Sequence, residues 1–341
     1  MILIKPVAVA VTWLVLGVLA GLACDDTPEV GVPGGGAPDV GAPEAEDGEA
    51  ALGAGLFVFG AGPGPVNDSA FVAGSNPLIG WRALEPEEGR YDWDVLDDAI
   101  AEASAAKSKV VPRILTNASL FGQPAPDWFF ETEGAAHYYP SAQAESEGFK
   151  APVPWDPVFR EKFGNFLVAL GQRYNDNSTI EFFQTSAGGG LYGEVVLTKD
   201  DSRFPEGWSP EVHLTSITYW LDRWIEAFPA TRLALMVNHV GYDIGENAAA
   251  YAAGRGIYLQ QNTPWLTPEG IAIFMAHQET TEIILEAEDG CNSTDEQAFE
   301  KLVETVFGYG FAIDYLHLCS ESLGDSITAA ELSSIWQRLR H

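Results

Sequence analysis

The sequence predicts an α/β protein whose folded part is a (β/α)8 barrel, and two observations carry this prediction. Eight short β-rich runs alternate with longer amphipathic stretches, and they occupy roughly 285 residues, close to the ~250 typical of such barrels. A doubly wound open sheet would need a Gly-rich phosphate-binding loop after the first run, but residues 60–64 (GAGPG) have a proline where the helix should start. The eight runs are residues 56–59, 78–84, 109–115, 179–185, 233–238, 256–261, 282–288 and 312–319.

Three of the expected helices have recognisable starts. Asp92 precedes apolar residues at helical spacing, and Asp156-Pro157 and Ser209-Pro210 each combine a capping side chain with a proline suited to the first helical turn. Two further helices are expected at residues 295–307 and 327–339. Each of these segments follows a β-rich run, as the crossover helices of a parallel barrel do.

The composition indicates a folded protein that does not bind nucleic acid. Of the 341 residues, 46% are hydrophobic and 11% aromatic, which is enough apolar surface for a sizeable core. The chain has 49 acidic residues and 18 Lys or Arg residues, a formal charge of -31. Because this charge repels phosphate backbones and anionic lipid surfaces, nucleic acid is not expected as a partner.

The N-terminal part of the chain is predicted to lie outside the barrel. Lys5 is followed by an apolar stretch at residues 6–23 and then by Cys24, which is the layout of an export signal. Residues 21–24 (GLAC) resemble a bacterial lipobox, at which cleavage leaves an acylated cysteine. A non-cleaved membrane anchor is the alternative, since the run is close to the length of a spanning helix. The predicted division is a lipoprotein-type signal peptide (1–23), a disordered acidic Gly/Pro/Ala linker (24–54) and the barrel domain (55–341).

The most specific motif lies at the end of the second run. Residues 81–93 read WRALEPEEGRYDW, and further motifs follow at Arg113, at residues 124–128 (PAPDW) and at residues 155–157 (WDP). Together they resemble clan A glycoside hydrolases, especially the β-galactosidase-like and related endo-acting groups. The resemblance covers most of the barrel domain. It implies a retaining glycosidase with one catalytic carboxylate at the end of the fourth strand and one at the end of the seventh.

The sequence offers a carboxylate for each role. Glu194 ends a glycine-rich loop after the fourth run and is the expected general acid/base, although the family usually has Asn where Gly193 stands. Glu286 and Glu288 lie on the same side of the seventh run. Glu286 is the expected nucleophile and Glu288 the reserve; the alternative is that one or both are solvated in the loop. Retaining hydrolysis requires one protonated and one ionised carboxyl group, because its transition state is oxocarbenium-like.

Aromatic, amide and guanidinium side chains at or beyond the strand ends are the expected substrate-binding residues, since sugars stack on flat apolar surfaces and hydrogen-bond to polar groups. Each has a simpler explanation: a tryptophan is more often a core residue, and Arg113 can pair with an inner glutamate. The set comprises Trp81, Arg113, Trp155, Gln184, Asn238, Gln260, Asn262 and Trp265.

No metal or other cofactor is expected. The six histidines lack the paired spacing of a metal site, and the G-x-S-x-G nucleophile elbow does not occur. Cys291 follows the seventh run and Cys319 ends the eighth, so neighbouring strands should bring them to one rim of the barrel. In an exported protein they are expected to form a disulfide, and the alternative is two separately buried thiols.

These features predict a retaining glycoside hydrolase that acts on a poly- or oligosaccharide in the cell envelope. Its expected partners are the carbohydrate substrate and, through the lipid at Cys24 alone, a membrane. The alternative is a non-catalytic carbohydrate-binding surface lipoprotein that has kept the groove and lost turnover, which the departure at Gly193 favours. No particular sugar, linkage or oligomeric state is predicted.

Overall fold

The computed structural model describes residues 55–59, 72–117, 122–186, 190–238, 243–262, 267–287 and 312–319, together with Gly308 and Gly310. Ten strands in these ranges form one sheet in which every pairing is parallel. In sheet order they are β3 Leu78–Gly80, β5 Arg113–Leu115, β8 Phe183–Thr185, β9 Leu233–Met236, β10 Tyr258–Asn262, β11 Ile283–Ala287, β12 Tyr315–Cys319, β1 Leu56–Phe59, β2 Gly74–Asn76 and β4 Lys109–Val110.

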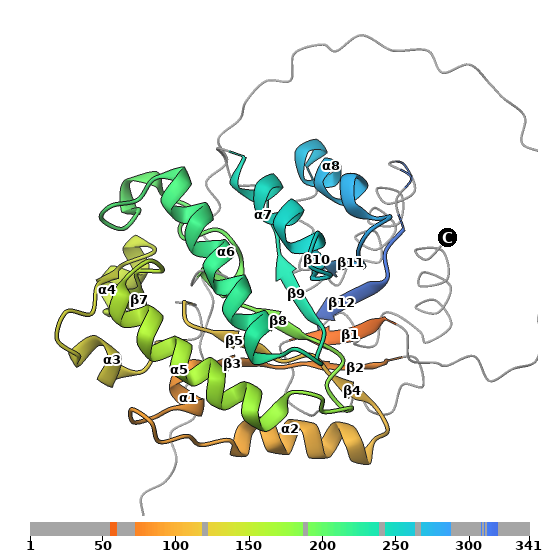
Figure 1. Ribbon diagram of the computed structural model, residues 1–341, viewed down its shortest axis with the longest axis horizontal. Coiled ribbons are helices and arrows are strands. Elements are labelled where there is room, and N and C mark those ends of the chain that lie inside the picture. The colour runs from red at the N-terminus through yellow and green to blue at the C-terminus, as the bar shows by residue number, and fades with distance from the viewer. Residues whose placement is uncertain are drawn as a thin grey trace, which may run out of the picture. The chain divides into compact units, whose positions relative to one another are not determined.

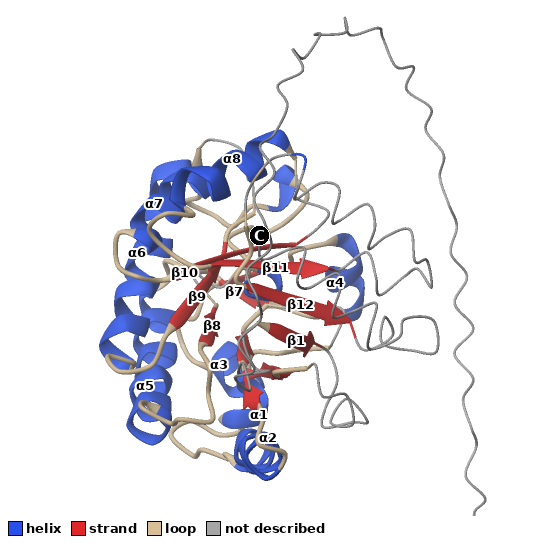
Figure 2. Ribbon diagram, turned by 90° about the vertical axis from the view of Figure 1, so that its right-hand side faces the viewer, coloured by secondary structure: helices blue, strands red, loops and turns tan. Residues whose placement is uncertain are grey.

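The sheet closes on itself into an eight-stranded barrel. β2 and β3 are parts of one strand interrupted at Pro77, and β4 and β5 are parts of the next, interrupted at residues 111–112. The ten-strand order begins with the pair β3–β5 and ends with the pair β2–β4. The same two barrel strands therefore stand at both ends of the order, which closes the sheet. β1 and β12, the first and last strands, also pair. The predicted (β/α)8 barrel is confirmed, and Figure 2 shows its helices in an arc around the strands.

Long helices between successive strands form the outer layer (Figure 1). None of the helices within the described ranges has both the length and the apolar character needed to cross a membrane. The helices predicted at residues 295–307 and 327–339 lie outside the described residues. The outer helices are α2 Asp94–Ala105, α5 Pro157–Tyr174, α6 Pro210–Ala227, α7 Ile244–Ala253 and α8 Pro268–His277.

Capping side chains fix where the outer helices begin. Asp156 Oδ1 accepts a hydrogen bond from the Phe159 amide at 2.8 Å, and Ser209 Oγ accepts one from the Val212 amide at 3.1 Å, so both predicted starts are confirmed. The predicted start of α2 at Asp92 is wrong by one residue. Trp93 is the N-cap there, and Asp92 Oδ1 instead accepts from the amide of Asp94, inside the helix.

The second predicted strand is shorter than its apolar run. β3 ends at Gly80, and residues 81–84 form the one-turn helix α1 Trp81–Leu84. A Cβ on Gly80 would lie 3.2 Å from the Pro124 backbone, and the Arg82 amide donates to Pro124 O at 2.7 Å. This close approach turns the chain outward, so the side chain of Trp81 packs against the helices rather than along the sheet.

An insertion that the sequence did not indicate lies between β5 and α5. It contains α3 Asp127–Glu131, β6 His137–Tyr138, α4 Ala142–Glu147 and β7 Ala151–Pro152, and β6 and β7 form an antiparallel pair. Tyr138, Ala151, Val153 and Leu197 form a small core of their own beneath it. The insertion therefore has a small hydrophobic core of its own.

The strand side chains divide between two cores. Residues that face outward, such as Leu233, Leu235 and Val237, join the large core that the outer helices cover. Eight inward residues form a second, smaller core at the amino-terminal end of the strands, one from each of the eight strands or its flank. This apolar floor consists of Phe57, Ala73, Val111, Phe182, Ala234, Tyr258, Ile284 and Tyr315.

Candidate active site

A polar layer lies directly above the apolar floor inside the barrel. Its members come from six strands, and all but Asn76 stand two residues after the floor residue of their strand, so strand alternation turns them inward. At this height the barrel interior changes from hydrocarbon to amide, guanidinium, carboxylate and imidazole groups, all of them buried. The layer consists of Asn76, Arg113, Gln184, Gln260, Glu286 and His317.

One chain of hydrogen bonds joins this layer, and its direction is determined by Arg113. Arg113 has only donors, and its Nε donates to Gln184 Oε1 at 2.7 Å. Gln184 must then present Nε2 to Gln260 Oε1, and Gln260 Nε2 donates to Glu286 Oε2 at 2.8 Å. Asn76 adds a second donor to Gln184 Oε1 at 2.7 Å. The chain ends on a carboxylate, which needs donors, so every amide orientation is consistent with its neighbours.

Glu286 is held as a buried carboxylate. Its side chain is 3% exposed and forms an ion pair with Arg113, which is equally buried. Burial alone would raise the pKa of Glu286, but Arg113 and the nearby His317 outweigh burial and hold that pKa well below its usual range. Burial lowers the pKa of His317 despite the neighbouring carboxylate. At neutral pH the site therefore contains an ionised Glu286 and a neutral imidazole.

The contacts of Glu286 fall on one oxygen. Arg113 and Gln260 both donate to Oε2, and His317 Nδ1 lies 3.9 Å from the same atom. Among the residues that the structure describes, no hydrogen-bond donor contacts Oε1. One oxygen thus anchors the carboxylate, and none of the described residues donates a competing hydrogen bond to the other.

Glu194 reaches the barrel from the loop after β8. The chain leaves β8, passes through the 3-10 turn η4 Leu191–Gly193 and returns beside β9, where Glu194 pairs with Met236. Gly190 is required for this return, because a Cβ there would lie 1.4 Å from the Glu194 carbonyl oxygen. The Glu194 side chain is 4% exposed and accepts a hydrogen bond from Asn262 Nδ2 at 2.9 Å.

The two glutamates share one strand as a support. Asn262 and Gln260 stand two positions apart on β10, facing inward, and they hydrogen-bond to Glu194 and Glu286 respectively. Two positions along a strand correspond to about 7 Å. The Cα of Glu286 is also in register with that of Asn262. The fold therefore brings the two predicted catalytic carboxylates to the same part of the barrel interior, with Glu194 bonded nearer the mouth.

All five predicted amide and guanidinium residues (Arg113, Gln184, Asn238, Gln260 and Asn262) lie in this interior, but two of the tryptophans do not. Trp81 is fully buried among five aromatic rings of the outer core, and its indole donates to Glu85 Oε2 at 2.7 Å. The structure thus gives it a core-packing position in place of the expected sugar-stacking one. Trp155 packs on the small core of the insertion and donates to the Glu206 carbonyl at 3.3 Å.

The remaining predicted residues lie, wholly or in their side chains, outside the part of the protein that the structure describes. Cys24, Trp265, Glu288 and Cys291 lie outside the described residues. Cys319 ends β12, next to β1, but its side chain is not described. The lipidation site, the reserve nucleophile and the disulfide stay predictions.

Two members of the polar layer were missed from the sequence. His317 follows Tyr315 by two residues on the eighth run, as Glu286 follows Ile284 on the seventh. Alternation along the strand, the argument used for Glu286, therefore also predicts that His317 faces inward. Asn76 stands before Pro77, at the interruption of its strand, and carried no such signal. It donates to Gln184 and to the Val111 carbonyl, which ties the interrupted second and third strands to the polar layer.

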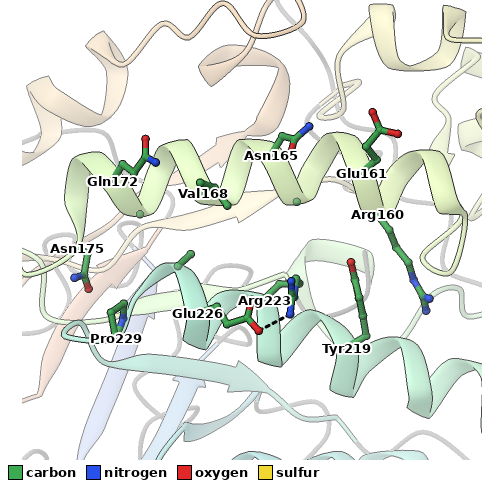
Figure 3. Close-up of a pocket in the computed structure, with 13 residues that line it drawn as sticks. Arg160, Glu161, Asn165, Val168, Gln172, Asn175, Tyr219, Arg223, Glu226 and Pro229 are labelled. Carbon is green, nitrogen blue, oxygen red and sulfur yellow. Dashed lines mark hydrogen bonds and ion pairs between the residues drawn. The ribbon is translucent and has the colours of Figure 1, made fainter.

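Within the described ranges, no group of three or more His, Cys, Asp or Glu side chains is suited to a metal ion. A groove of about 520 Å³ lies between α5 and α6, where Arg160 and Arg223 approach the ring of Tyr219 and Arg223 pairs with Glu226 (Figure 3). It is on the outer helical face, and none of the predicted site residues lines it.

Comparison with known proteins finds similarity to glycoside hydrolases. Residues 76–204 match the family model of glycoside hydrolase family 42, described as beta-galactosidase. The beta-galactosidase BbgII of Bifidobacterium bifidum is 26% identical over 158 residues, 46% of this chain and 22% of that protein. The beta-galactosidase BgaA of a Thermus species is 29% identical over 126 residues, 34% of this chain and 17% of that protein. This chain therefore spans a minor part of each relative's length.

A solved structure extends the likeness to the whole barrel. The catalytic domain of beta-amylase from Paenibacillus polymyxa superposes with a TM-score of 0.57, covering 84% of this chain and 97% of that one at 12% identity. At this identity the likeness concerns the fold, whereas the sequence relatives support a glycoside hydrolase function. The chain is a glycoside-hydrolase-like (β/α)8 barrel, similar to the beta-galactosidase family over residues 76–204.

Proposed function

We propose that the protein is a retaining glycoside hydrolase acting on a poly- or oligosaccharide, with Glu286 as nucleophile and Glu194 as general acid/base. The observation that carries the proposal is the state of Glu286. It is buried, its pKa is held low and its hydrogen bonds fall on Oε2. A carboxylate oxygen that accepts no hydrogen bond from a described residue, inside a barrel and in the same part of it as a second glutamate, suits attack on an anomeric carbon.

The environment of Glu286 supports the nucleophilic role chemically. Arg113 keeps the carboxylate ionised, and the Arg113–Gln184–Gln260 chain fixes the plane of the group before substrate arrives. A general acid would need the opposite environment, in which the pKa is raised so that a proton is present at neutral pH. Glu286 is therefore the ionised partner of the pair.

Glu194 supplies the proton in this scheme. It is nearly as buried as Glu286, and it accepts a hydrogen bond from the neutral amide of Asn262. A neutral donor permits either protonation state, which a residue that gives and later takes a proton requires. Substrate binding beside the ionised Glu286 would also favour a protonated Glu194 through like-charge repulsion.

The reaction then proceeds in two displacements. Glu286 Oε1 attacks the anomeric carbon, the glycosidic C–O bond breaks, and the Glu194 proton passes to the leaving oxygen. Water next attacks the anomeric carbon while Glu194 takes its proton, and the bond to Glu286 breaks. The sugar is released with its original anomeric configuration, and both carboxyl groups return to their starting states.

The test uses two variants and two kinds of substrate. Glu286→Gln should abolish turnover of every glycoside, whereas Glu194→Gln should spare aryl glycosides whose leaving group needs no proton. A 2-deoxy-2-fluoro glycoside should label the Glu286 peptide, as mass spectrometry would detect, and proton NMR should show a product of retained configuration. The Glu85→Gln variant is a control, since that buried glutamate bonds to Trp81 and Gly89 on the outer side of the barrel.

Three outcomes would contradict the assignment. Full activity of Glu286→Gln with an inactive Glu288→Gln would move the nucleophile by two residues along the strand. An inverted product would replace the covalent step by a water attack with Glu286 as base. If sugars bind but neither carboxylate matters for turnover, the protein is a carbohydrate-binding barrel and not a hydrolase.

A further inference from the structure

Asn238 stands on the interior face of the barrel, directly after β9. Leu233, Leu235 and Val237 face the outer core, so the alternate residues of this strand, Ala234, Met236 and Asn238, face inward. Asn238 has no exposed surface. Its amide is therefore enclosed at the carboxyl end of a barrel strand, where substrates of such barrels bind.

Among the residues that the structure describes, this amide has no hydrogen-bond partner. Within the described part of the chain, no atom donates to Asn238 Oδ1 and none accepts from Nδ2. Exchanging the two atoms by rotation changes nothing, because both are unpaired. A buried polar group left in this state costs about 1–3 kcal/mol, and the large majority of buried side-chain amides avoid it. Asn76, which is equally buried, shows the usual state, with donors and acceptor all engaged.

The position of Asn238 relates it to the proposed catalytic pair. Met236 is in register with Gln260, and the Val237 amide donates to the Gln260 carbonyl at 2.7 Å. The same register, continued by one pleat, sets Asn238 beside Asn262, which holds Glu194. On the other side of β9, Ser186 directly follows β8; it is 1% exposed, and its Oγ is also without a partner among the described residues.

We propose that Asn238, with Ser186, binds a neutral hydroxyl-bearing sugar unit next to the bond that Glu194 protonates. This inference rests on the proposed function and names the substrate class. An amide offers both an acceptor and donors, and a sugar hydroxyl is itself both donor and acceptor, so one hydroxyl or two neighbours satisfy both atoms. A carboxylate would leave Oδ1 unpaired, and an ammonium group would leave Nδ2 unpaired. At this position the site therefore suits a hydroxyl better than the carboxylate of a uronic acid or the ammonium group of an amino sugar.

Truncation of a ligand-binding residue and truncation of a residue that stabilises the fold should change the melting temperature in opposite directions. Removing the Asn238 amide removes an unpaired buried group, so Asn238→Ala should melt at or above the wild-type temperature. Its kcat/KM on the best neutral p-nitrophenyl glycoside should fall about 10- to 100-fold, the equivalent of one to two lost hydrogen bonds to a buried amide. Asn76→Ala, the matched control, should instead melt at a lower temperature, because it breaks paired bonds.

The experiment assays wild type, Asn238→Ala, Ser186→Ala and Asn76→Ala on a panel of p-nitrophenyl glycosides, their monodeoxy forms and the corresponding glucuronide. Wild type should prefer a neutral glycoside and lose activity on one particular deoxy form, and Asn238→Ala should show no further loss on that form. Unchanged kcat/KM in Asn238→Ala, a fall in melting temperature as large as that of Asn76→Ala, or preference for the glucuronide would each overturn the inference.

The same variants separate this inference from the hydrolase proposal. If wild type binds neutral oligosaccharides in calorimetric titrations but hydrolyses none, the hydrolase proposal fails while weaker binding by Asn238→Ala upholds the subsite. If wild type hydrolyses glycosides and Asn238→Ala does so equally well, the subsite fails alone. If wild type neither binds nor hydrolyses any member of the panel, both proposals are overturned.

Discussion

The buried ion pair between Arg113 and Glu286 leads to a prediction that concerns stability rather than activity. Arg113→Met keeps most of the side-chain volume but leaves Glu286, 3% exposed, without its guanidinium partner. Breaking a buried pair by removing one partner costs about 3–5 kcal/mol of unfolding free energy. The hydrogen bond from Gln260 remains, so the lower half of this range is expected at neutral pH.

The sign of the pH dependence distinguishes this mechanism from lost packing. In wild type the pKa of Glu286 is lowered from 4.5, so its contribution to stability is present above that value and lost only as pH falls through the lower folded pKa. In Arg113→Met, burial raises the folded pKa above the unfolded value. The variant's deficit should then be largest at pH 8 and shrink on acidification toward pH 5, by up to about 1.4 kcal/mol per pH unit.

Urea unfolding of both proteins between pH 5 and pH 8 measures this difference. Arg82→Met is the matched control, since Arg82 pairs with Asp127 at 2.6 Å on the surface, with side chains 50% and 61% exposed. Its deficit should stay below about 1 kcal/mol at every pH. A deficit in Arg113→Met that is small, or that does not change with pH, would show that Arg113 does not hold Glu286 ionised.

The other predictions concern the ends of the chain and one helix. Removing residues 1–54 should leave a soluble, folded domain with the melting temperature of the longer protein, and insoluble material would contradict the boundary at residue 55. Cys24→Ser should release the exported protein from membranes, and a variant that stayed membrane-bound would exclude a lipid anchor there. Mass spectrometry without reductant should find Cys291 joined to Cys319, and two free thiols would exclude the bridge. By closing a loop of this length the disulfide should stabilise the folded state by roughly 3–4 kcal/mol. Asp156→Ala should cost about 1 kcal/mol in chemical denaturation because it removes the cap of α5, and an unchanged midpoint would show that the cap is dispensable.

The sequence predicted best what depends on local chemistry. Asp156-Pro157 and Ser209-Pro210 start helices because capping oxygens and prolines act within one turn. Glu286 was expected to face inward because alternation along a strand is local. The Arg113 pairing with an inner glutamate, considered as the simpler explanation of that residue, is what the structure contains.

Features that depend on distant contacts were not accessible in this way. The run at residues 78–84 is apolar throughout, and only the approach of Pro124 to Gly80 turns its second half into helix. Trp81 lies at a strand end, as a sugar-stacking residue would, but the rings that surround it come from α3 and α5. The lack of a hydrogen-bond partner for Asn238 among the described residues likewise depends on how neighbouring strands are placed, which the sequence does not show.

The contacts of the polar layer, and the contact between Glu194 and Asn262, join the region similar to beta-galactosidases to the strands that follow it, and this has an evolutionary consequence. Residues 76–204, the part similar to beta-galactosidases, supply Arg113, Gln184 and Glu194, while their partners Glu286, Gln260 and Asn262 come from the later strands. A gene recombined at this boundary would have to provide an acceptor for the guanidinium, an amide for the chain and a donor for the acid at once. Surface and loop residues of the two segments can be substituted independently, but the residues of these three contacts can change only together.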